Sequence, residues 1–120
     1  MTIEDLRTGW EQIDDDECRR AAGNVELIGR RWSSAIMLGI ARGASRFSDI
    51  LASVTGLSDR MLALRLKELE RVGLVDRIVE PTTPVTVRYV LTARGRDLMA
   101  ALQPLVRYGQ RWEAAESKHD

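Results

Sequence analysis

Basic side chains recur along one face of the segment 58–71. Arg60, Lys67 and Arg71 fall on the same side of a helix drawn through this segment, opposite its leucines. Arginine can form paired hydrogen bonds with a phosphate or with the edge of guanine, and the methyl group of Ala63 can approach the methyl group of thymine. The spacing therefore favours contact with double-stranded DNA.

Ten side chains in residues 58–88 are candidates for this contact. The hydroxyl of Ser58, at the start of the helix, can bind a phosphate. Arg65 can instead pair with Glu68, and the threonines at 82–86 can instead shape a turn, so both alternatives stay open. The candidates are Ser58, Arg60, Met61, Ala63, Arg65, Lys67, Thr82, Thr83, Thr86 and Arg88.

The single cysteine, Cys18, is a candidate site for oxidation or for addition of an electrophile. The reactive form is the thiolate, which Arg19, Arg20 and a helix N-terminus would favour. The acids at 14–17 would oppose it, so the direction of the net effect is open. The alternative is a small thiol without a chemical role.

The formal net charge of zero hides an asymmetry along the chain. Residues 1–17 hold seven acids against Arg7, which leaves 17 basic and 11 acidic side chains in residues 18–120. A basic body suits a polyanionic partner, because each neutralised phosphate releases a condensed counterion. The first residues form a separate acidic arm.

Several function classes are not supported by the sequence. No nucleophile–base pair, metal-ligand spacing or glycine-rich phosphate loop is present, and the only histidine is His119, so we expect no enzyme, metal or cofactor. No stretch approaches the ~20 apolar residues of a membrane span. Glu4, Asp5 and Arg7 interrupt any signal-peptide pattern, and we expect a cytoplasmic protein without membrane contact.

Periodic apolar positions predict the helices that position these side chains. The pattern predicts a short N-terminal helix ending near Ile13, then helices over 18–31 and 32–42, the last of them buried. The acidic run 14–17 either ends the first helix or caps the second. A short helix at 47–51, a turn at Gly56 and an amphipathic helix over 58–72 follow.

Alternating residues at 74–79 and 85–91 predict two strands of a hairpin, with two prolines in its tip. A final helix starts at Thr92, and Pro104 should kink or divide it. The predicted fold is mainly α with a small β-hairpin, a winged helix-turn-helix with N- and C-terminal dimerisation helices. The predicted parts are an acidic arm (1–17), a DNA-binding domain (18–92) and a dimerisation helix with its tail (93–120).

The two terminal helices have more apolar surface than a small winged domain can cover. Pairing of two copies about a two-fold axis would bury this surface, whereas folding back onto the same domain is the alternative. The expected interface residues are Trp10, Ile13, Leu98, Leu102, Leu105, Val106 and Trp112.

Five motifs follow one another in a fixed order between about residues 18 and 112. They are GRRW at 29–32, RF at 46–47, LSDRMLALRLKELERVGLVDR at 57–77, EPTTPVTVRYVLT at 80–92 and ARG at 93–95. In this order the chain resembles the HxlR-type winged helix-turn-helix transcription regulators of the MarR-like superfamily. It departs from them at Asp59, where many members carry proline or another residue.

The resemblance implies a homodimer that binds an inverted-repeat operator and represses or activates nearby genes. Some relatives sense electrophiles or oxidants through a cysteine shortly before the helix that leads to the motif tryptophan, and Cys18 stands fourteen residues before Trp32. These relatives often have proline after the cysteine, where this chain has Arg19. With one cysteine, the oxidised products would be an intersubunit disulfide, a mixed disulfide or an adduct.

Two alternatives to a redox-responsive regulator remain. A small-molecule effector could bind at the dimer interface, in a space lined by Trp10, Trp32, Trp112 and Met37. Otherwise the winged domain could serve as a protein-interaction module, with the outer face of 60–71 meeting an acidic partner. A steep loss of affinity with salt would indicate DNA.

Overall fold

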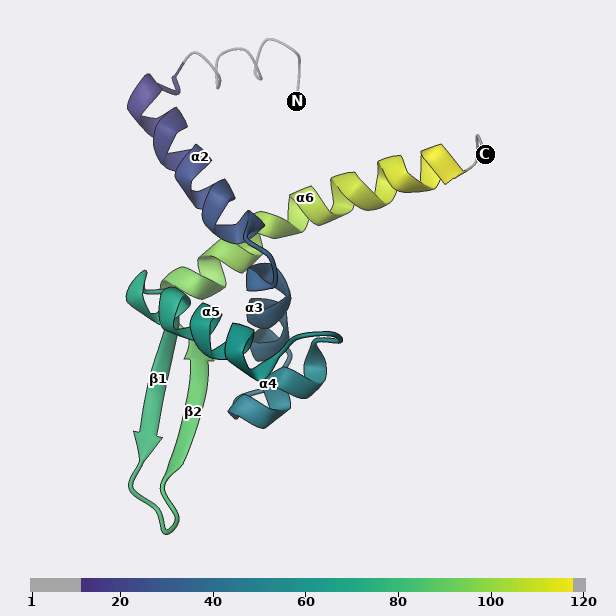
Figure 1. The fold of residues 1–120 in the computed structure, drawn as a ribbon. Helices are drawn as coiled ribbons and strands as arrows, with labels where there is room; N and C mark the ends of the chain where they lie inside the picture. Colours follow the sequence, from purple (N-terminus) through teal and green to yellow (C-terminus); the bar gives the residue numbers. More distant parts are fainter. Residues whose placement is uncertain (1–11, 118–120) are drawn as a thin grey trace. The chain divides into compact units, whose positions relative to one another are not determined.

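The computed structural model describes residues 12–117, and their side chains through residue 113. The chain forms two compact units, residues 1–34 and 35–120. The elements are α2 (Asp15–Gly29), α3 (Ser33–Ala41), α4 (Phe47–Ser53), α5 (Asp59–Arg71), β1 (Val75–Glu80), β2 (Thr86–Leu91) and α6 (Ala93–Ser117) (Figure 1). None of the described helices is both long enough and apolar enough to cross a membrane. The helix expected before Ile13 lies outside the described residues, except for its end.

Helix α2 begins with a reciprocal cap made by acidic side chains. The Asp14 carboxylate accepts a hydrogen bond from the Glu17 main-chain N–H at 2.7 Å, and Glu17 accepts one from the Asp14 N–H at 3.4 Å. Of the two roles left open for the acidic run, it therefore caps the helix that follows it. This cap starts α2 three residues before the predicted boundary, and α2 buries no residue.

The core of the second unit is built around α3, as its apolar sequence predicts. Ile36 and Met37 are at most 1% exposed. The helix ends before Gly43, whose φ of 112° is accessible to glycine at little cost. The largest buried side chains of this unit are Ile36, Met37, Ile50, Leu62, Leu66, Leu69, Leu74 and Val75.

Helices α4 and α5 form the helix-turn-helix. Gly56 lies in the turn between them with φ of 85°. The Ser58 hydroxyl accepts a hydrogen bond from the Met61 main-chain N–H at 3.1 Å, which confirms the predicted N-cap. Leu62, Leu66 and Leu69 form the buried face of α5. The sequence pattern therefore predicted both the start and the inner face of this helix.

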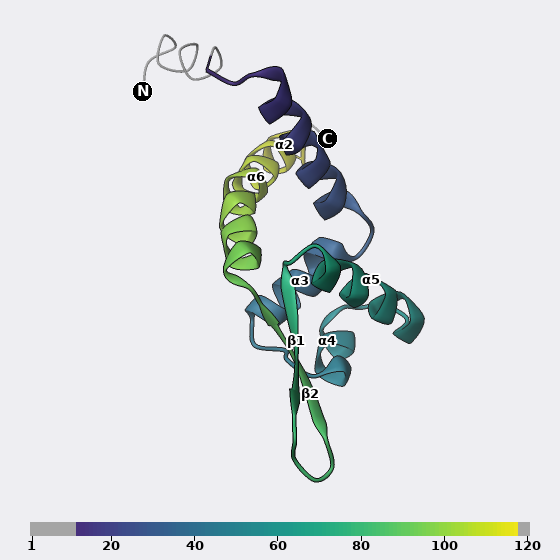
Figure 2. The same cartoon turned by 90° about the vertical axis from the view of Figure 1, so that its left-hand side faces the viewer.

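The hairpin extends beyond the helices of the second unit (Figure 2). In its antiparallel register, Val75 pairs with Leu91 and Arg77 pairs with Tyr89. Val75 and Leu91 are buried, and side chains two residues apart share a face of the sheet, so Arg77 and Tyr89 continue outward along the core-facing side. A main-chain hydrogen bond of 2.7 Å from Tyr89 to the Ser45 carbonyl ties β2 to the segment before α4.

Hydrogen bonds of Thr92 connect the end of α5, the hairpin and the start of α6. Its hydroxyl donates to the Gly73 carbonyl at 2.6 Å and accepts from the Gly95 N–H at 3.0 Å. Its main-chain N–H donates to the Leu74 carbonyl at 3.1 Å. This confirms Thr92 as the cap of α6. The helix continues through Pro104, so the expected alternative of a division there does not hold.

Gly95→Ala is expected to lower the free energy of unfolding by about 1–3 kcal/mol, because the added methyl group would overlap the main-chain carbonyl of Leu74. Urea denaturation measures this change. Gly23→Ala is the control, since a methyl group there has no atom within 4 Å and alanine favours a helix. Equal stability of Gly95→Ala and the wild type would contradict the close packing.

Candidate nucleic-acid interface

The outer face of α5 presents the side chains that the sequence singled out for DNA contact. Arg60, Ala63 and Lys67 are exposed, and Met61 is half-buried on the flank. Ser58 is exposed at the helix start, although its hydroxyl also caps the helix. Burial of the leucines on the opposite side leaves this face pointing into solvent. The expected grouping of these side chains is therefore present in the structure.

Arg65 differs from the other cations of α5. Its guanidinium lies 3.1 Å from the Glu68 carboxylate, and the two side chains are only 16% and 10% exposed. The ion pair that the sequence left as an alternative is thus formed. Arg65 is consequently less available to an incoming anion than Arg60 or Lys67.

In the wing, defined as residues 75–91, three of the four candidate side chains have partners within the wing itself. The Thr82 hydroxyl donates to the Pro84 carbonyl at 2.8 Å and lies 3.0 Å from the Thr86 hydroxyl. These two threonines thus form the turn, the alternative left open for them. Thr82 and Thr83 are both exposed. The Arg88 guanidinium lies 3.2 Å from the Glu80 carboxylate, with 43% of the Arg88 side chain exposed.

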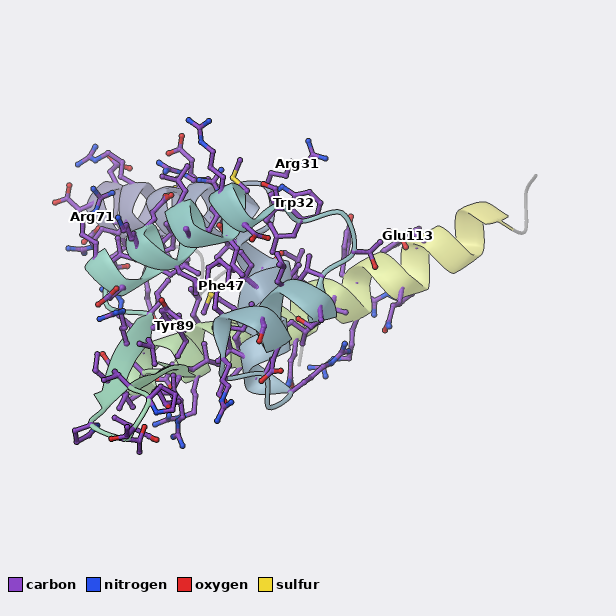
Figure 3. All side chains as sticks on the ribbon, turned by 60° about the horizontal axis from the view of Figure 1, so that its bottom comes forward. Arg31, Trp32, Phe47, Arg71, Tyr89 and Glu113 are labelled. Atoms are coloured by element: carbon purple, nitrogen blue, oxygen red, sulfur yellow. The ribbon has the colours of Figure 1, made fainter. Side chains whose placement is uncertain are left out.

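A crease runs between α5 and the hairpin, with a volume of about 330 Å³. Figure 3 shows Phe47 and Tyr89 between the ribbon of α5 and that of the hairpin. Two cationic side chains from different elements line the crease, Lys67 from α5 and Arg77 from β1. The complete lining is Phe47, Ala63, Leu66, Lys67, Glu70, Arg77 and Tyr89.

Arg77 and Tyr89 are not among the site residues predicted from the sequence. A signal for Arg77 was present, because it occupies the apolar alternation of β1 between Val75 and Val79. A charged side chain on the core-facing side of a strand must project past the edge of the core or find a partner. The Arg77 side chain accordingly lines the crease.

Helix α6 exposes a group of large apolar side chains. Leu105 is 60% exposed, Val106 57%, and Tyr108 and Trp112 54% each. Tyr108 was not among the predicted interface residues, and its ring lies against that of Trp112 with centroids 6.4 Å apart. Of the other predicted interface residues, Leu98 and Leu102 are half-buried, Ile13 is exposed, and Trp10 lies outside the described residues.

Cys18 lies exposed in the first turns of α2. The adjacent Arg19 forms an ion pair with the carboxylate of Asp16. No group of acidic, histidine or cysteine side chains in the described part of the chain has a metal-binding arrangement.

The four residues suggested for an effector site do not all face an open space. Met37 is 1% exposed within the core, which removes it from the expected lining. Trp32 is half-buried, with the Arg31 guanidinium 4.8 Å from the centre of its ring. Such a contact is a cation–π interaction.

The order of elements and the cationic outer face of the second helix define the class of winged helix-turn-helix DNA-binding proteins. Residues 27–117 match the family described as HxlR-like helix-turn-helix. The chain belongs to this family, which confirms the resemblance and fold predicted from the sequence.

The sequences of known relatives align with most of this chain. The uncharacterized HTH-type transcriptional regulator YvaP of Bacillus subtilis is 39% identical over 95 residues, covering 79% of this chain and 88% of YvaP. The crystal structure of diamide-treated YodB from B. subtilis is 38% identical, covers 75% of this chain and 89% of YodB, and has a TM-score of 0.69. The redox regulator HypR in its oxidized form is 29% identical, with a TM-score of 0.68, and covers 77% of this chain and 95% of HypR. The protein is a helix-turn-helix transcriptional regulator.

Proposed function

We propose that the protein binds a specific operator through the outer face of α5, which enters the major groove of DNA. The observation that carries this proposal is the division of α5 into a buried leucine face and an exposed face with Arg60, Ala63 and Lys67. A helix of this width fits the major groove, where base pairs present distinct donors and acceptors. The exposed Ser58 hydroxyl accepts a hydrogen bond from the Met61 N–H, and its own proton is left to donate to a phosphate at the start of α5.

The regulator acts as a homodimer on an inverted repeat, with residues 93–120 as its dimerisation segment. The exposed apolar side of α6 supports this proposal, because isolated monomers rarely leave several large apolar side chains together in water. A two-fold axis would place two copies of α5 in successive major grooves, about 34 Å apart.

Oxidation of Cys18 regulates DNA binding in this proposal. Its exposure on α2 and the similarity to YodB and HypR support the idea. In an intersubunit disulfide, two Cys18 thiols would lose two protons and two electrons to an oxidant such as diamide. A mixed disulfide with a small thiol would follow the same balance.

Arg60→Ala is expected to weaken binding to DNA that the wild-type protein selects from a random pool. The loss of a paired contact to guanine corresponds to roughly a 5- to 150-fold weaker affinity and to a relaxed preference at one base position. A gel-shift titration on the selected sequence and on its point variants measures both. Arg107→Gln, which removes the same charge from exposed α6, is the control. Wild-type affinity and preference of Arg60→Ala would remove Arg60 from base recognition.

Leu105→Glu is expected to shift the protein from dimer to monomer, because it places a charge in the centre of the exposed apolar side of α6. Sedimentation velocity measures the change, and circular dichroism checks that the fold is retained. Arg107→Gln serves again as control, since residue 107 falls on the opposite side of the helix. A wild-type protein that sediments as a monomer, or a variant that stays dimeric, would contradict this interface.

Treatment with diamide is expected to change the operator affinity of the wild type by about tenfold or more, equivalent to about 1.4 kcal/mol. Cys18→Ser, which lacks the thiol, should keep its affinity under the same treatment. Non-reducing gel electrophoresis and mass measurement identify the product. Oxidised wild-type protein with unchanged affinity would show that Cys18 does not control binding.

A further inference from the structure

The crease between α5 and the hairpin lies where a DNA strand must pass if α5 occupies the major groove. The two grooves of B-DNA are separated by a sugar–phosphate backbone. A helix in the major groove and a hairpin beside it therefore have a backbone strand between them. The side chains that face this strand are those that line the junction of the two elements.

We propose that Lys67 and Arg77 together hold a backbone phosphate of this strand in the crease. The inference rests on the proposed function, because it requires α5 to be bound in the groove. It assigns Lys67 to a phosphate and not to a base edge, so this side chain positions the protein on DNA and does not read the sequence. It also adds Arg77, a residue from the hairpin, to the interface.

Two observations single out Lys67 and Arg77: their side chains are not in ion pairs, and both line the same cavity. Arg65 pairs with Glu68, and Arg88 pairs with Glu80. Neither the Lys67 side chain nor the Arg77 side chain has a hydrogen bond or ion pair within the part of the chain that the structure describes. Both line one cavity, and their charges are therefore available to an incoming anion.

The charge of the crease remains positive when its acid is included. Glu70 lines the same cavity and offsets one of the two positive charges. The total is +1, which suits a single phosphodiester, because each phosphate of the backbone carries one negative charge. An arginine and a lysine can share such an anion, the arginine through paired hydrogen bonds and the lysine as a point charge.

The remaining lining suits the sugar that flanks a phosphate. Phe47 and Tyr89 supply aromatic surface (Figure 3). The small side chain of Ala63, which also lines the crease, leaves room beside Lys67. The hydrogen bond from the Tyr89 N–H to the Ser45 carbonyl holds the hairpin at this point. Because Arg77 is the cross-strand partner of Tyr89, this bond also fixes the backbone that carries the Arg77 side chain. Because a phosphate has the same charge at every base pair, this contact fixes the register of the protein without reading the sequence.

The test is a salt titration of DNA binding by wild type, Arg77→Gln and Arg77→Lys, on the selected operator and on an unrelated duplex. Arg77→Gln is expected to weaken both complexes by the same factor and to reduce the slope of log affinity against log salt by about one. Arg77→Lys keeps the charge and should retain the wild-type slope. Arg107→Gln, outside the crease, should also retain it.

Three results would overturn the phosphate contact. The first is a wild-type salt slope for Arg77→Gln. The second is a loss of affinity confined to the operator, which would indicate base reading. The third is a lowered melting temperature for both Arg77 variants with an equal loss of binding, which would indicate a purely structural role. In each case the wild type still binds its operator, whereas a wild type without affinity for DNA would refute the proposed function itself.

Discussion

The burial of one face of α5 is the constraint on which the rest of the structure depends. Leu62, Leu66 and Leu69 are at most 2% exposed, and removal of each side chain from water contributes about 1.5–3 kcal/mol. Since helical geometry fixes the angle between these leucines and all other positions of α5, the same packing determines which side chains face outward. Arg60 and Lys67 are thus oriented by interactions that they do not themselves make.

Nearby acidic side chains determine which of the arginines and lysines around α5 are already in ion pairs. Glu68 and Glu80 neutralise Arg65 and Arg88. The Arg88–Glu80 pair is the more exposed of the two, and such a pair adds little stability, of the order of 0–1 kcal/mol. Both pairs reduce the number of charges offered to an anion. Arg60 and Lys67 stay exposed on the outer face of α5, and Arg77 lines the adjacent crease. A chain with no net charge therefore still presents cations on this surface.

The sequence predicted the order of the elements because their signals are local. Ser58 and Thr92 are caps whose partners lie three residues away, and the hairpin follows from alternation along two short segments. The role of a side chain could not be predicted from the sequence where its partner is distant in the chain or where two local partners compete for it. Arg77 joins Lys67 only through the path of the hairpin, and the choice between DNA and Glu68 for Arg65 depends on their mutual burial. The continuity of α6 through Pro104 likewise depends on more than the local proline rule.

The bonds around Thr92 have a mechanical consequence. Within a few residues they join the carbonyl after α5, the base of the hairpin and the first turn of α6. The Arg94 guanidinium adds a bond of 2.7 Å to the Val72 carbonyl, and that of Arg96 a bond of 3.0 Å to the Leu91 carbonyl. No flexible linker separates α6 from the two elements that flank the crease. Rotation of α6 about its first turn would therefore move α5 and the hairpin together, so that motion of α6 is carried to the outer face of α5 and to the crease.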